Sequence, residues 1–421
     1  MGISSSLYAG ISGLNANGNA MSVIGNNLAN TNTVGFKSGR TVFADMLSSS
    51  ISGSGGASQV GRGVTLSTVD NIFSQGTFET TESNTDLALE GEGFFVVSAA
   101  GSKENLYTRA GAFGFDKQGY LVNPEGYRVQ GYPYDDNETL LSTLGDIRVD
   151  GTSTVPAKAT AEMTLSNNLD SNSAIIPGGF SLADPQGTSN YSSSIQVYDS
   201  LGNTHLLTTY FTKTADNEWD WNTVALGSEV VGVDPATEPL LLLDKDPAAI
   251  LSFNSDGALT APVTTSLTMP AWLGGSEADV SVDINFNATQ YARDSSTVGQ
   301  EQDGFSAGDL VKVAIETSGD VVASYTNGER VAVGRIGLAR FANIGGLFKE
   351  GGNLYSATTA SGLPSDAAAS TKIFTNSLEQ SNVDMGLEFV KMITTQRGFQ
   401  ANSKIITTTD EMLAELINLK R

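Results

Sequence analysis

The chain has 421 residues, of which 23 are Lys or Arg and 46 are Asp or Glu, so its net charge at neutral pH is −23. An acidic surface of this kind repels phosphate backbones and anionic lipid, which argues against nucleic-acid binding. The absence of cysteine excludes disulfides, zinc–thiolate sites and thiol catalysis. A single histidine, His205, makes a histidine-based metal site or a Ser-His-Asp triad a poor candidate.

The N-terminal segment has the pattern of a bundle helix. Leu7, Leu14, Met21 and Leu28 repeat every seven residues, which predicts a helix over about 4–29 with an apolar seam. Its interior glycines each cost about 1 kcal/mol relative to alanine, so this helix needs neighbours to hold it. The segment lacks the basic and apolar regions of a Sec signal peptide, and no run of the sequence reaches the ~18 apolar residues of a membrane span. These features alone favour a cytoplasmic protein.

The stretch from Ser48 to Gly63 is rich in serine and glycine, and its composition predicts a connector that either flexes or folds against its neighbours. From about residue 72 the apolar period changes towards two, with turn signals at 116–119 and 123–126 between short strand candidates. A second β-like block covers about 292–365 and contains the hairpin signal Asn327-Gly328.

The segment between these two blocks is also β-like but far more acidic. Residues 148–291 contain 17 acidic and four basic side chains, a net charge of −13. Residues 199–203 form a plausible hairpin turn between two alternating stretches. An acidic β-rich insertion within a second β-rich domain is therefore predicted here.

The C-terminal segment repeats the helical pattern, and a helix is predicted over about 383–419. The apolar residues with a 4-3 spacing are Met385, Phe389, Met392, Phe399, Ile406, Leu413 and Ile417. Residues 1–70 and 371–421 have net charges of +1 and zero, which leaves −24 for the middle of the chain. This shared character suggests that the two ends belong together, as a coiled coil or as two ordinary amphipathic helices on a globular core.

The predicted fold class is mainly β with α-helical termini, in a nested multidomain chain whose terminal helices pair as a coiled coil. The expected domains are 1–71 with 366–421 (helical assembly domain), 72–147 with 292–365 (discontinuous β-rich middle domain) and 148–291 (inserted acidic β-rich outer domain). Nesting of this kind brings the two termini side by side.

No constellation for catalysis is present, so the chain is not expected to be an enzyme or to need a cofactor or metal. It has no Gly-x-x-x-x-Gly-Lys phosphate loop and no Gly-x-Ser-x-Gly nucleophile elbow. The acidic run 216–220 lacks the glycine and the distal glutamate of a calcium loop, so a hairpin tip is predicted there. His205 is predicted to be a strand residue with a satisfied hydrogen bond.

Four motifs resemble the bacterial flagellar rod and hook protein family. The segment 26–37 (Asn-Asn-Leu-Ala-Asn-Thr-Asn-Thr-Val-Gly-Phe-Lys) is similar to its N-terminal signature, and 381–402 is similar to its C-terminal one. Residues 91–113 and 335–343 resemble the two legs of the family's β domain. The signature positions taken from this resemblance are Asn27, Ala29, Asn30, Thr31, Gly35, Phe36 and Lys37.

The resemblance implies a structural subunit of the hook, which polymerises into a curved helical tube that joins rod to filament and transmits torque as a universal joint. The implied partners are further copies of the chain, the distal rod protein, the hook cap and the hook–filament junction proteins. The flagellar type III apparatus would export the subunit without cleavage, which replaces the cytoplasmic expectation with an extracellular one. No nucleic acid and no membrane insertion are expected, and the seam residues of both terminal helices would form the assembly interface.

Two alternatives remain open from the sequence. One is the distal rod protein of the same family, which lacks so large an insertion. The other is a β-rich extracellular binding protein or adhesin, which would need exposed aromatic pockets built from Trp219, Trp221 and Trp272.

Overall fold

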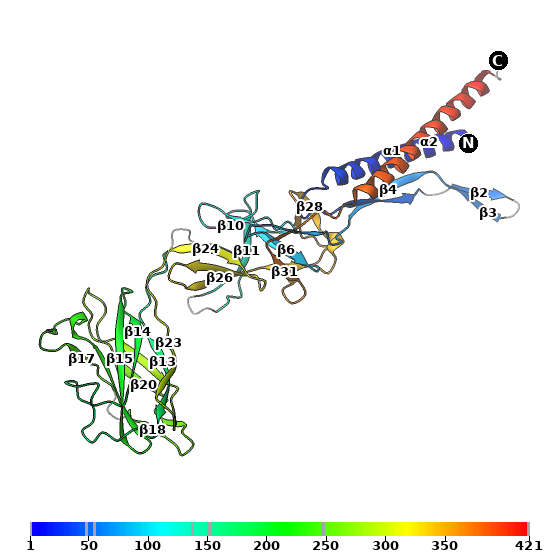
Figure 1. Cartoon of the computed structure of the whole chain (residues 1–421). Coiled ribbons are helices and arrows are strands. Elements are labelled where there is room, and N and C mark those ends of the chain that lie inside the picture. The colour runs from blue at the N-terminus through cyan, green and yellow to red at the C-terminus, as the bar shows by residue number, and fades with distance from the viewer. Residues whose placement is uncertain are drawn as a thin grey trace. The chain divides into compact units, whose positions relative to one another are not determined.

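The computed structural model describes residues 2–46, 49–53, 56–135, 139–149, 154–245 and 249–418. The chain divides into two compact units, Met1–Gly151 with Val313–Ala323 and Val331–Arg421, and Thr152–Lys312 with Ser324–Arg330. Figure 1 shows both, with the two long α-helices in the first unit and strands in each. The predicted class, mainly β with helical termini, is confirmed.

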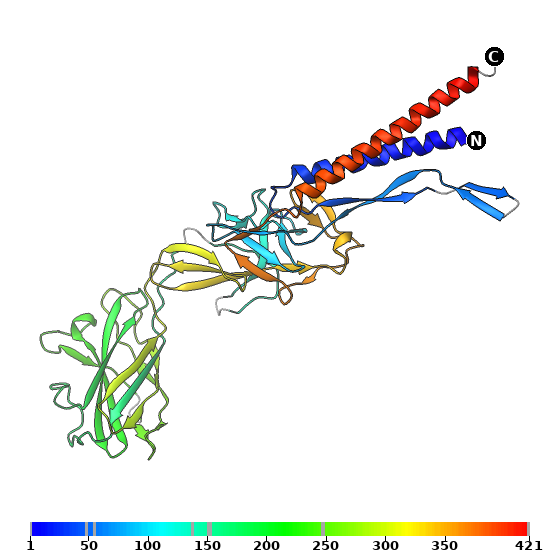
Figure 2. The ribbon, with the colours of Figure 1, turned by 45° about the vertical axis from the view of Figure 1, so that its right-hand side comes forward.

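The two terminal helices lie side by side and run antiparallel. They are α1 (Gly2–Ala29) and α2 (Met385–Asn418), and Figure 2 shows both chain ends at the same end of the pair. The side chain of Asp384 caps α2, because its Oδ1 accepts a hydrogen bond from the backbone N–H of Leu387 at 3.0 Å. The helix limits match the prediction closely, and the coiled-coil geometry of the pair stays a prediction.

A long β-hairpin packs against α1 in the first unit. Its base is formed by β1 (Gly39–Asp45) and β4 (Val64–Asn71), and β2 (Ser49–Gly53) pairs with β3 (Gly56–Val60) beyond it. In the serine- and glycine-rich segment 48–63, residues 49–53 and 56–60 thus form a paired hairpin, while residues 48, 54 and 55 lie outside the described residues. The pairing of β1 with β4 brings the two arms together, so serine and glycine pair beyond it despite their low strand propensity.

The rest of the first unit is built mainly on one sheet. Its strand order is β24-β25-β26-β11-β7-β8-β29-β28, with β9, β10, β12, β27 and β30 attached, and the pairs β5–β32 and β6–β31 lie outside it. The bounds are β5 Phe78–Thr80, β6 Leu87–Glu90, β7 Phe94–Ser98, β8 Asn105–Thr108, β9 Gly114–Phe115, β10 Leu121–Val122, β11 Arg128–Pro133, β12 Gly145–Asp146, β24 Leu310–Ile315, β25 Asp320–Tyr325, β26 Arg330–Ile336, β27 Leu338–Arg340, β28 Phe348–Gly351, β29 Leu354–Ser356, β30 Ser365–Asp366, β31 Lys372–Thr375 and β32 Ser377–Glu379. An aromatic cluster that includes Phe94, Tyr107, Phe341 and Tyr355 fills its core.

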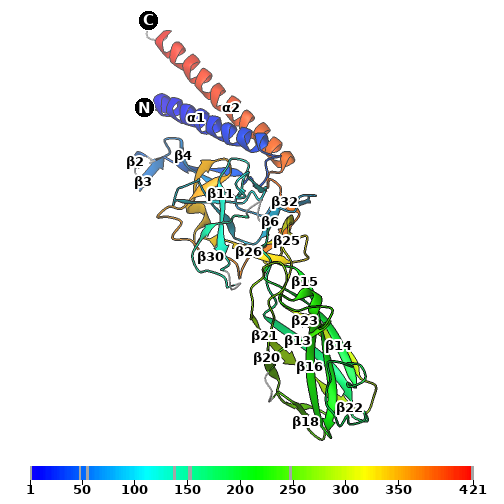
Figure 3. The same cartoon turned by 90° about the vertical axis from the view of Figure 1, so that its left-hand side faces the viewer.

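The second unit is a sandwich of two sheets around one core. One sheet has the order β20-β21-β13-β22 with β23 paired to β13, and the other has the order β14-β15-β16-β18-β19 with β17 paired to β16 (Figure 3). The bounds are β13 Glu162–Asp170, β14 Tyr191–Tyr198, β15 Thr204–Ala215, β16 Glu218–Leu226, β17 Leu240–Leu242, β18 Leu251–Phe253, β19 Leu259–Ala261, β20 Thr264–Thr268, β21 Ser281–Phe286, β22 Thr289–Tyr291 and β23 Ser296–Gln302.

All three tryptophans belong to the core of this sandwich. Trp219 and Trp221 are fully buried, and Trp272 is nearly so. The indole N–H of Trp221 donates to the carbonyl of Ala249 at 2.7 Å, and that of Trp219 donates to Gln290 Oε1 at 3.2 Å. Buried, hydrogen-bonded indoles cannot line the exposed aromatic pockets that an adhesin would need.

Several predicted turns are confirmed. Residues 199–203 join β14 to β15, Asn327-Gly328 joins β25 to β26, and the tip of the predicted hairpin at 216–220 joins β15 to β16. The second unit extends past the predicted end of the insertion at residue 291, because β23 pairs with β13 across Met163–Asn168. The three-domain division itself stays a prediction.

Candidate assembly interface

Small residues on α1 allow the two terminal helices to approach closely. Gly10, Gly13, Ala16 and Ala20 are buried along α1. A Cβ atom at Gly13 would lie 2.6 Å from the amide of Asn402, which is the contact that keeps this position small. The buried stripe of α1 is thus mostly glycine and alanine, with Ile24 and Asn27 at the base of the helix.

The predicted seam of α1 lies beside this stripe. Leu7, Leu14, Met21 and Leu28 are each half-buried, so none of them is part of the packed interior of the unit. Glycine and alanine bring the helix axes together, and the larger side chains then flank the contact instead of filling it.

The predicted seam residues of α2 divide into two groups. Met392, Ile406 and Leu413 are half-buried, and a Cβ atom at Gly10 would lie 3.0 Å from Ile406. Met385, Phe389, Phe399 and Ile417 are exposed.

Further apolar side chains of α2 also face solvent. Phe389 is 51% exposed and Val390 60%, and Leu387, Ile393 and Ile405 are exposed as well. Contiguous apolar exposure on a helix marks a surface that binds a partner. Most of the apolar surface of α2 is therefore not packed against any of the described residues.

Asn27 joins the bases of the two helices. Its side-chain amide N–H donates to the carbonyl of Gly39 at 2.8 Å and to Glu388 Oε2 at 3.2 Å, and its Oδ1 accepts the N–H of Gly39 at 2.9 Å. Asn382 has a similar role, because its Oδ1 accepts the N–H of Ser38 at 2.8 Å while its amide donates to the carbonyl of Ile72 at 2.7 Å. These two side chains fix α1, α2 and the long hairpin to one another.

A buried ion triad lies beneath this joint. Lys37 Nζ donates to Glu379 Oε1 at 2.6 Å and to the carbonyl of Ser74 at 2.8 Å. The same Oε1 accepts the N–H of Gly76 at 2.9 Å, and Arg109 Nη1 lies 3.7 Å from Glu379 Oε2. All three charged side chains are at most 2% exposed. One carboxylate thus serves two buried cations.

Burial shifts the ionisation of this cluster. It lowers the pKa of Lys37 and that of Arg109, while the charge of Glu379 opposes both shifts. Burial also raises the pKa of Tyr355, which lies close enough to feel the charges of Arg109 and Glu379. The triad holds strands and loops that are hundreds of residues apart in sequence, so it acts as an internal fastening of the first unit.

The remaining signature residues shape the chain between α1 and the triad. Gly35 has φ +70°, and a Cβ atom there would lie 2.6 Å from the backbone nitrogen of Ala110. Phe36 is buried beneath Lys349, whose Nζ lies 4.3 Å from the ring centre, and burial lowers the pKa of Lys349. The hydroxyl of Thr31 donates to the carbonyl of Leu28 at 2.8 Å.

Two other signature positions are less constrained. Asn30 is half-buried and its amide donates to the carbonyl of Asn26 at 2.9 Å, whereas Ala29 is exposed at the end of α1. The sequence reasoning assigned no role to Arg109 or Glu379. The available signal was Lys37 itself, since a lysine beside buried Phe36 requires a carboxylate.

The other predicted site features are structural. His205 is buried at the start of β15, stacked on Trp272 with ring centres 3.8 Å apart, and its Nδ1 lies 2.7 Å from Glu229 Oε2. Among the described residues no group of three His, Cys, Asp or Glu side chains could hold a metal ion. Within the same residues, neither helix has the length and apolar character to span a membrane.

Four family models match consecutive parts of the chain. They are Flagella basal body rod protein (residues 7–37), Flagellar hook protein FlgE/F/G D1 domain (88–168), Flagellar basal body protein FlaE D2 domain (168–305) and Flagellar basal body rod FlgEFG protein C-terminal (375–419). The first and last of these contain the signature, α2 and most of α1.

The chain is also similar to flagellar hook proteins over its whole length. It is 38% identical to the flagellar hook protein FlgE of Borreliella burgdorferi over 99% of both chains. It is 34% identical to that of Treponema pallidum, again over 99% of both, and 34% identical to that of Salmonella typhimurium over 97% of this chain and 98% of the relative.

Among solved structures, the Helicobacter pylori flagellar hook protein FlgE2 aligns with a TM-score of 0.53 at 18% identity, covering 72% of this chain and 100% of that chain, a likeness of fold alone. The full-length identities above carry the assignment. The chain therefore belongs to the flagellar hook protein FlgE family.

Proposed function

We propose that this chain polymerises through its terminal helices into the curved tube of the flagellar hook, which joins rod to filament and transmits torque as a universal joint. Hook proteins are structural subunits, and this chain is a structural protein with no enzymatic role. The observation that carries the proposal is the exposed apolar surface of α2, from Leu387 to Ile405. A helix of 34 residues spans about 51 Å, so neighbouring subunits have a long surface to cover.

The interface we propose consists of the predicted seam residues of both helices together with the exposed apolar side chains of α2 from Leu387 to Ile405, which include Val390. On α2, Met385, Phe389, Phe399 and Ile417 are exposed and available to a neighbouring copy. On α1, Leu7, Leu14, Met21 and Leu28 are half-buried and supply the remainder of their surface. Identical subunits joined by contacts between two different patches form an open helix when the rotation does not close, which is the geometry of a tube.

Charge supports this arrangement. The terminal segments are close to neutral, so many copies can lie side by side there without repulsion. The acidic excess belongs to the middle of the chain, where we propose modest polar contacts that slide as a bent tube rotates. The apolar helices hold the tube together during this motion.

We further propose the partners and location that the family implies. The distal rod protein lies at one end of the tube, the hook cap and then the junction proteins lie at the other, and the type III apparatus exports the subunit without cleavage. The mature location is extracellular, in the hook.

The experiment is assembly of purified chain, measured by sedimentation and by electron microscopy for curved tubes of uniform diameter. Val390→Asp places a charge in the proposed interface, which costs several kcal/mol per subunit, so the concentration needed for tubes rises by about a hundredfold or more. Leu201→Asp changes an equally exposed apolar residue in the turn before β15 and leaves assembly unchanged. Tubes formed by Val390→Asp at the wild-type concentration would overturn the interface.

A further inference from the structure

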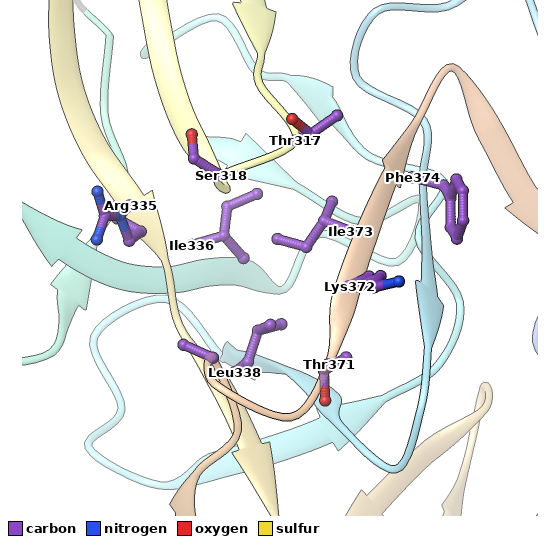
Figure 4. Close-up of a pocket in the computed structure, with 10 residues that line it drawn as sticks. Thr317, Ser318, Arg335, Ile336, Leu338, Thr371, Lys372, Ile373 and Phe374 are labelled. Carbon is purple, nitrogen blue, oxygen red and sulfur yellow. The ribbon is translucent and has the colours of Figure 1, made fainter.

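An apolar hollow of about 380 Å³ opens on the first unit, away from the terminal helices. Figure 4 shows the side chains of Ile336, Leu338 and Ile373 pointing towards its middle, from β26, β27 and β31. The turn at Thr317 and Ser318 forms one rim. All three apolar residues are buried, so side chains of the core form the lining of the hollow.

The hollow has two cations at its edge. The guanidinium of Arg335 is held by Asp320, with Nε to Oδ1 at 2.8 Å and Nη2 to Oδ2 at 3.1 Å. Lys372 is exposed, and no carboxylate of the described residues lies within ion-pair distance of it. An occupant with an apolar tip and a nearby carboxylate would satisfy both features of the hollow.

The same unit carries a side chain of matching character. Leu363 is 89% exposed, more than any other large apolar side chain in the described part of the chain. Pro364, which follows it, has a fixed φ, and Gly362, which precedes it, adopts the left-handed φ of +78° that turns the chain here. Asp366, also exposed, follows three residues later in β30, which pairs with β27 beside the hollow of its own chain. Its Oδ1 accepts the N–H of Ala368 at 2.9 Å, which leaves Oδ2 of this exposed side chain for a partner cation.

The loop that carries Leu363 is anchored on its N-terminal side. Ser361 is fully buried, and its hydroxyl donates to the carbonyl of Thr358 at 2.9 Å. The hydroxyl of Thr358 in turn donates to the carbonyl of Gly346 at 2.6 Å. A leucine presented by a fixed loop loses little entropy when it binds.

We propose that Leu363 of one subunit inserts into the hollow of a second copy of this chain, with Asp366 beside Lys372. The loop and the hollow are different patches that lie next to each other, because β30 pairs with β27. In the contact we propose, each copy offers its loop to one neighbour and its hollow to another, so the contact is heterologous and propagates in one direction, as an open polymer requires. The inference rests on the proposed function and adds to it a subunit contact outside the terminal helices.

The absence of cysteine makes the contact directly testable. Leu363→Cys and Thr317→Cys are prepared as separate single variants, mixed, assembled into tubes and treated with a short bis-maleimide. We expect covalent dimers from the mixture and none from either variant alone, because only the heterologous contact brings the two positions together. Dilute, unassembled mixtures give no dimer.

Three results would overturn the contact. One is tubes without covalent dimers, which leaves the proposed function intact. Another is a link within one chain when both cysteines are placed in the same dilute monomer, which shows that the loop covers its own hollow. Failure of the unmodified chain to form tubes would instead overturn the proposed function, and this contact with it.

A second readout does not depend on cross-linking. Leu363→Asp raises the concentration needed for tubes by about tenfold or more, whereas Leu363→Met, which keeps an apolar side chain of similar length, leaves it unchanged. Leu141→Asp is the matched control, since Leu141 is an exposed leucine of the same unit outside the proposed contact. Equal behaviour of Leu363→Asp and Leu141→Asp contradicts the proposal.

Discussion

The buried triad leads to an asymmetric prediction. Among the described residues, Glu379 is the carboxylate within ion-pair distance of both Lys37 and Arg109, and the more distant charge of Glu92 also favours charged Arg109. Glu379→Gln leaves both cations buried without an ion-pair partner, and breaking a buried ion pair in this way costs about 3–5 kcal/mol. Lys37→Met leaves Arg109 and Glu379 as a one-to-one pair and removes one desolvated charge, so it costs about 1–2 kcal/mol, the scale of a lost hydrogen bond.

The size of the effect is measurable in a chain of this length. A loss of about 3–5 kcal/mol corresponds to a fall of roughly 6–20 °C in the melting temperature of a unit of this size. Lys37→Met shifts it by only a few degrees. The melting temperature of the first unit is therefore expected to be highest for the wild type, lower for Lys37→Met and lowest for Glu379→Gln.

The assay separates the two units. All three tryptophans lie in the second unit, so tryptophan emission during heating serves as an internal control that neither variant changes. Amide hydrogen exchange of peptides from β7 and β8 reports the first unit, because both strands lie in its main sheet. Equal destabilisation by the two variants, or a larger effect of Lys37→Met, would show that the triad is not held by one shared carboxylate.

Three further predictions follow from single contacts. Burial alone would raise the pKa of Asp320, but hydrogen bonds, the largest from Arg335, hold that pKa below its ordinary value of about 3.9. The stabilisation from Asp320 is therefore present above that pH and is lost as the pH falls through the folded-state pKa. Asp320→Asn flattens the acid dependence of amide exchange in the first unit below about pH 4, and an unchanged profile contradicts this. Gly35→Ala lowers first-unit stability by more than the ~1–2 kcal/mol of a left-handed residue, whereas Gly18→Ala, with no atom near the added Cβ, raises it by up to about 1 kcal/mol, both measured by urea unfolding. Protease trims both terminal helices from dilute monomer and spares them in tubes, and equal protection in the two states contradicts coupled folding.

Local patterns predict the elements of this chain well where the period and the turn chemistry agree. Asn327-Gly328 and 199–203 were identified as hairpin turns because their residue types accept the required backbone angles, and both join consecutive strands. The end of the insertion was harder, because β23 belongs with β13 through pairing across more than 120 residues. No pattern within β23 contains that information.

The helix seam shows a limit of apolar periodicity. Counting large apolar residues selects Leu14 and Met21, whereas the buried stripe of α1 contains Gly13, Ala16 and Ala20. Close helix packing depends on the absence of side-chain bulk, which a search for large apolar residues cannot detect. Local patterns cannot predict the triad either, because residues 37, 109 and 379 are far apart in sequence and meet only in the folded unit.

The joint at the helix bases and the small-residue stripe of α1 have opposite consequences for the stability of the first unit. The joint around Asn27 and the triad is closed by buried hydrogen bonds and ion pairs, so the bases of the helices are fixed within one chain. Farther along, α1 offers α2 only a narrow stripe of small residues, and each glycine in it lowers helix stability. The outer turns of both helices therefore obtain their remaining stabilisation from contacts such as those available to Val390 and Phe389, which the single chain does not provide. We therefore expect folding of the outer helical turns to be coupled to polymerisation, with an existing tube end as the preferred template for the next subunit.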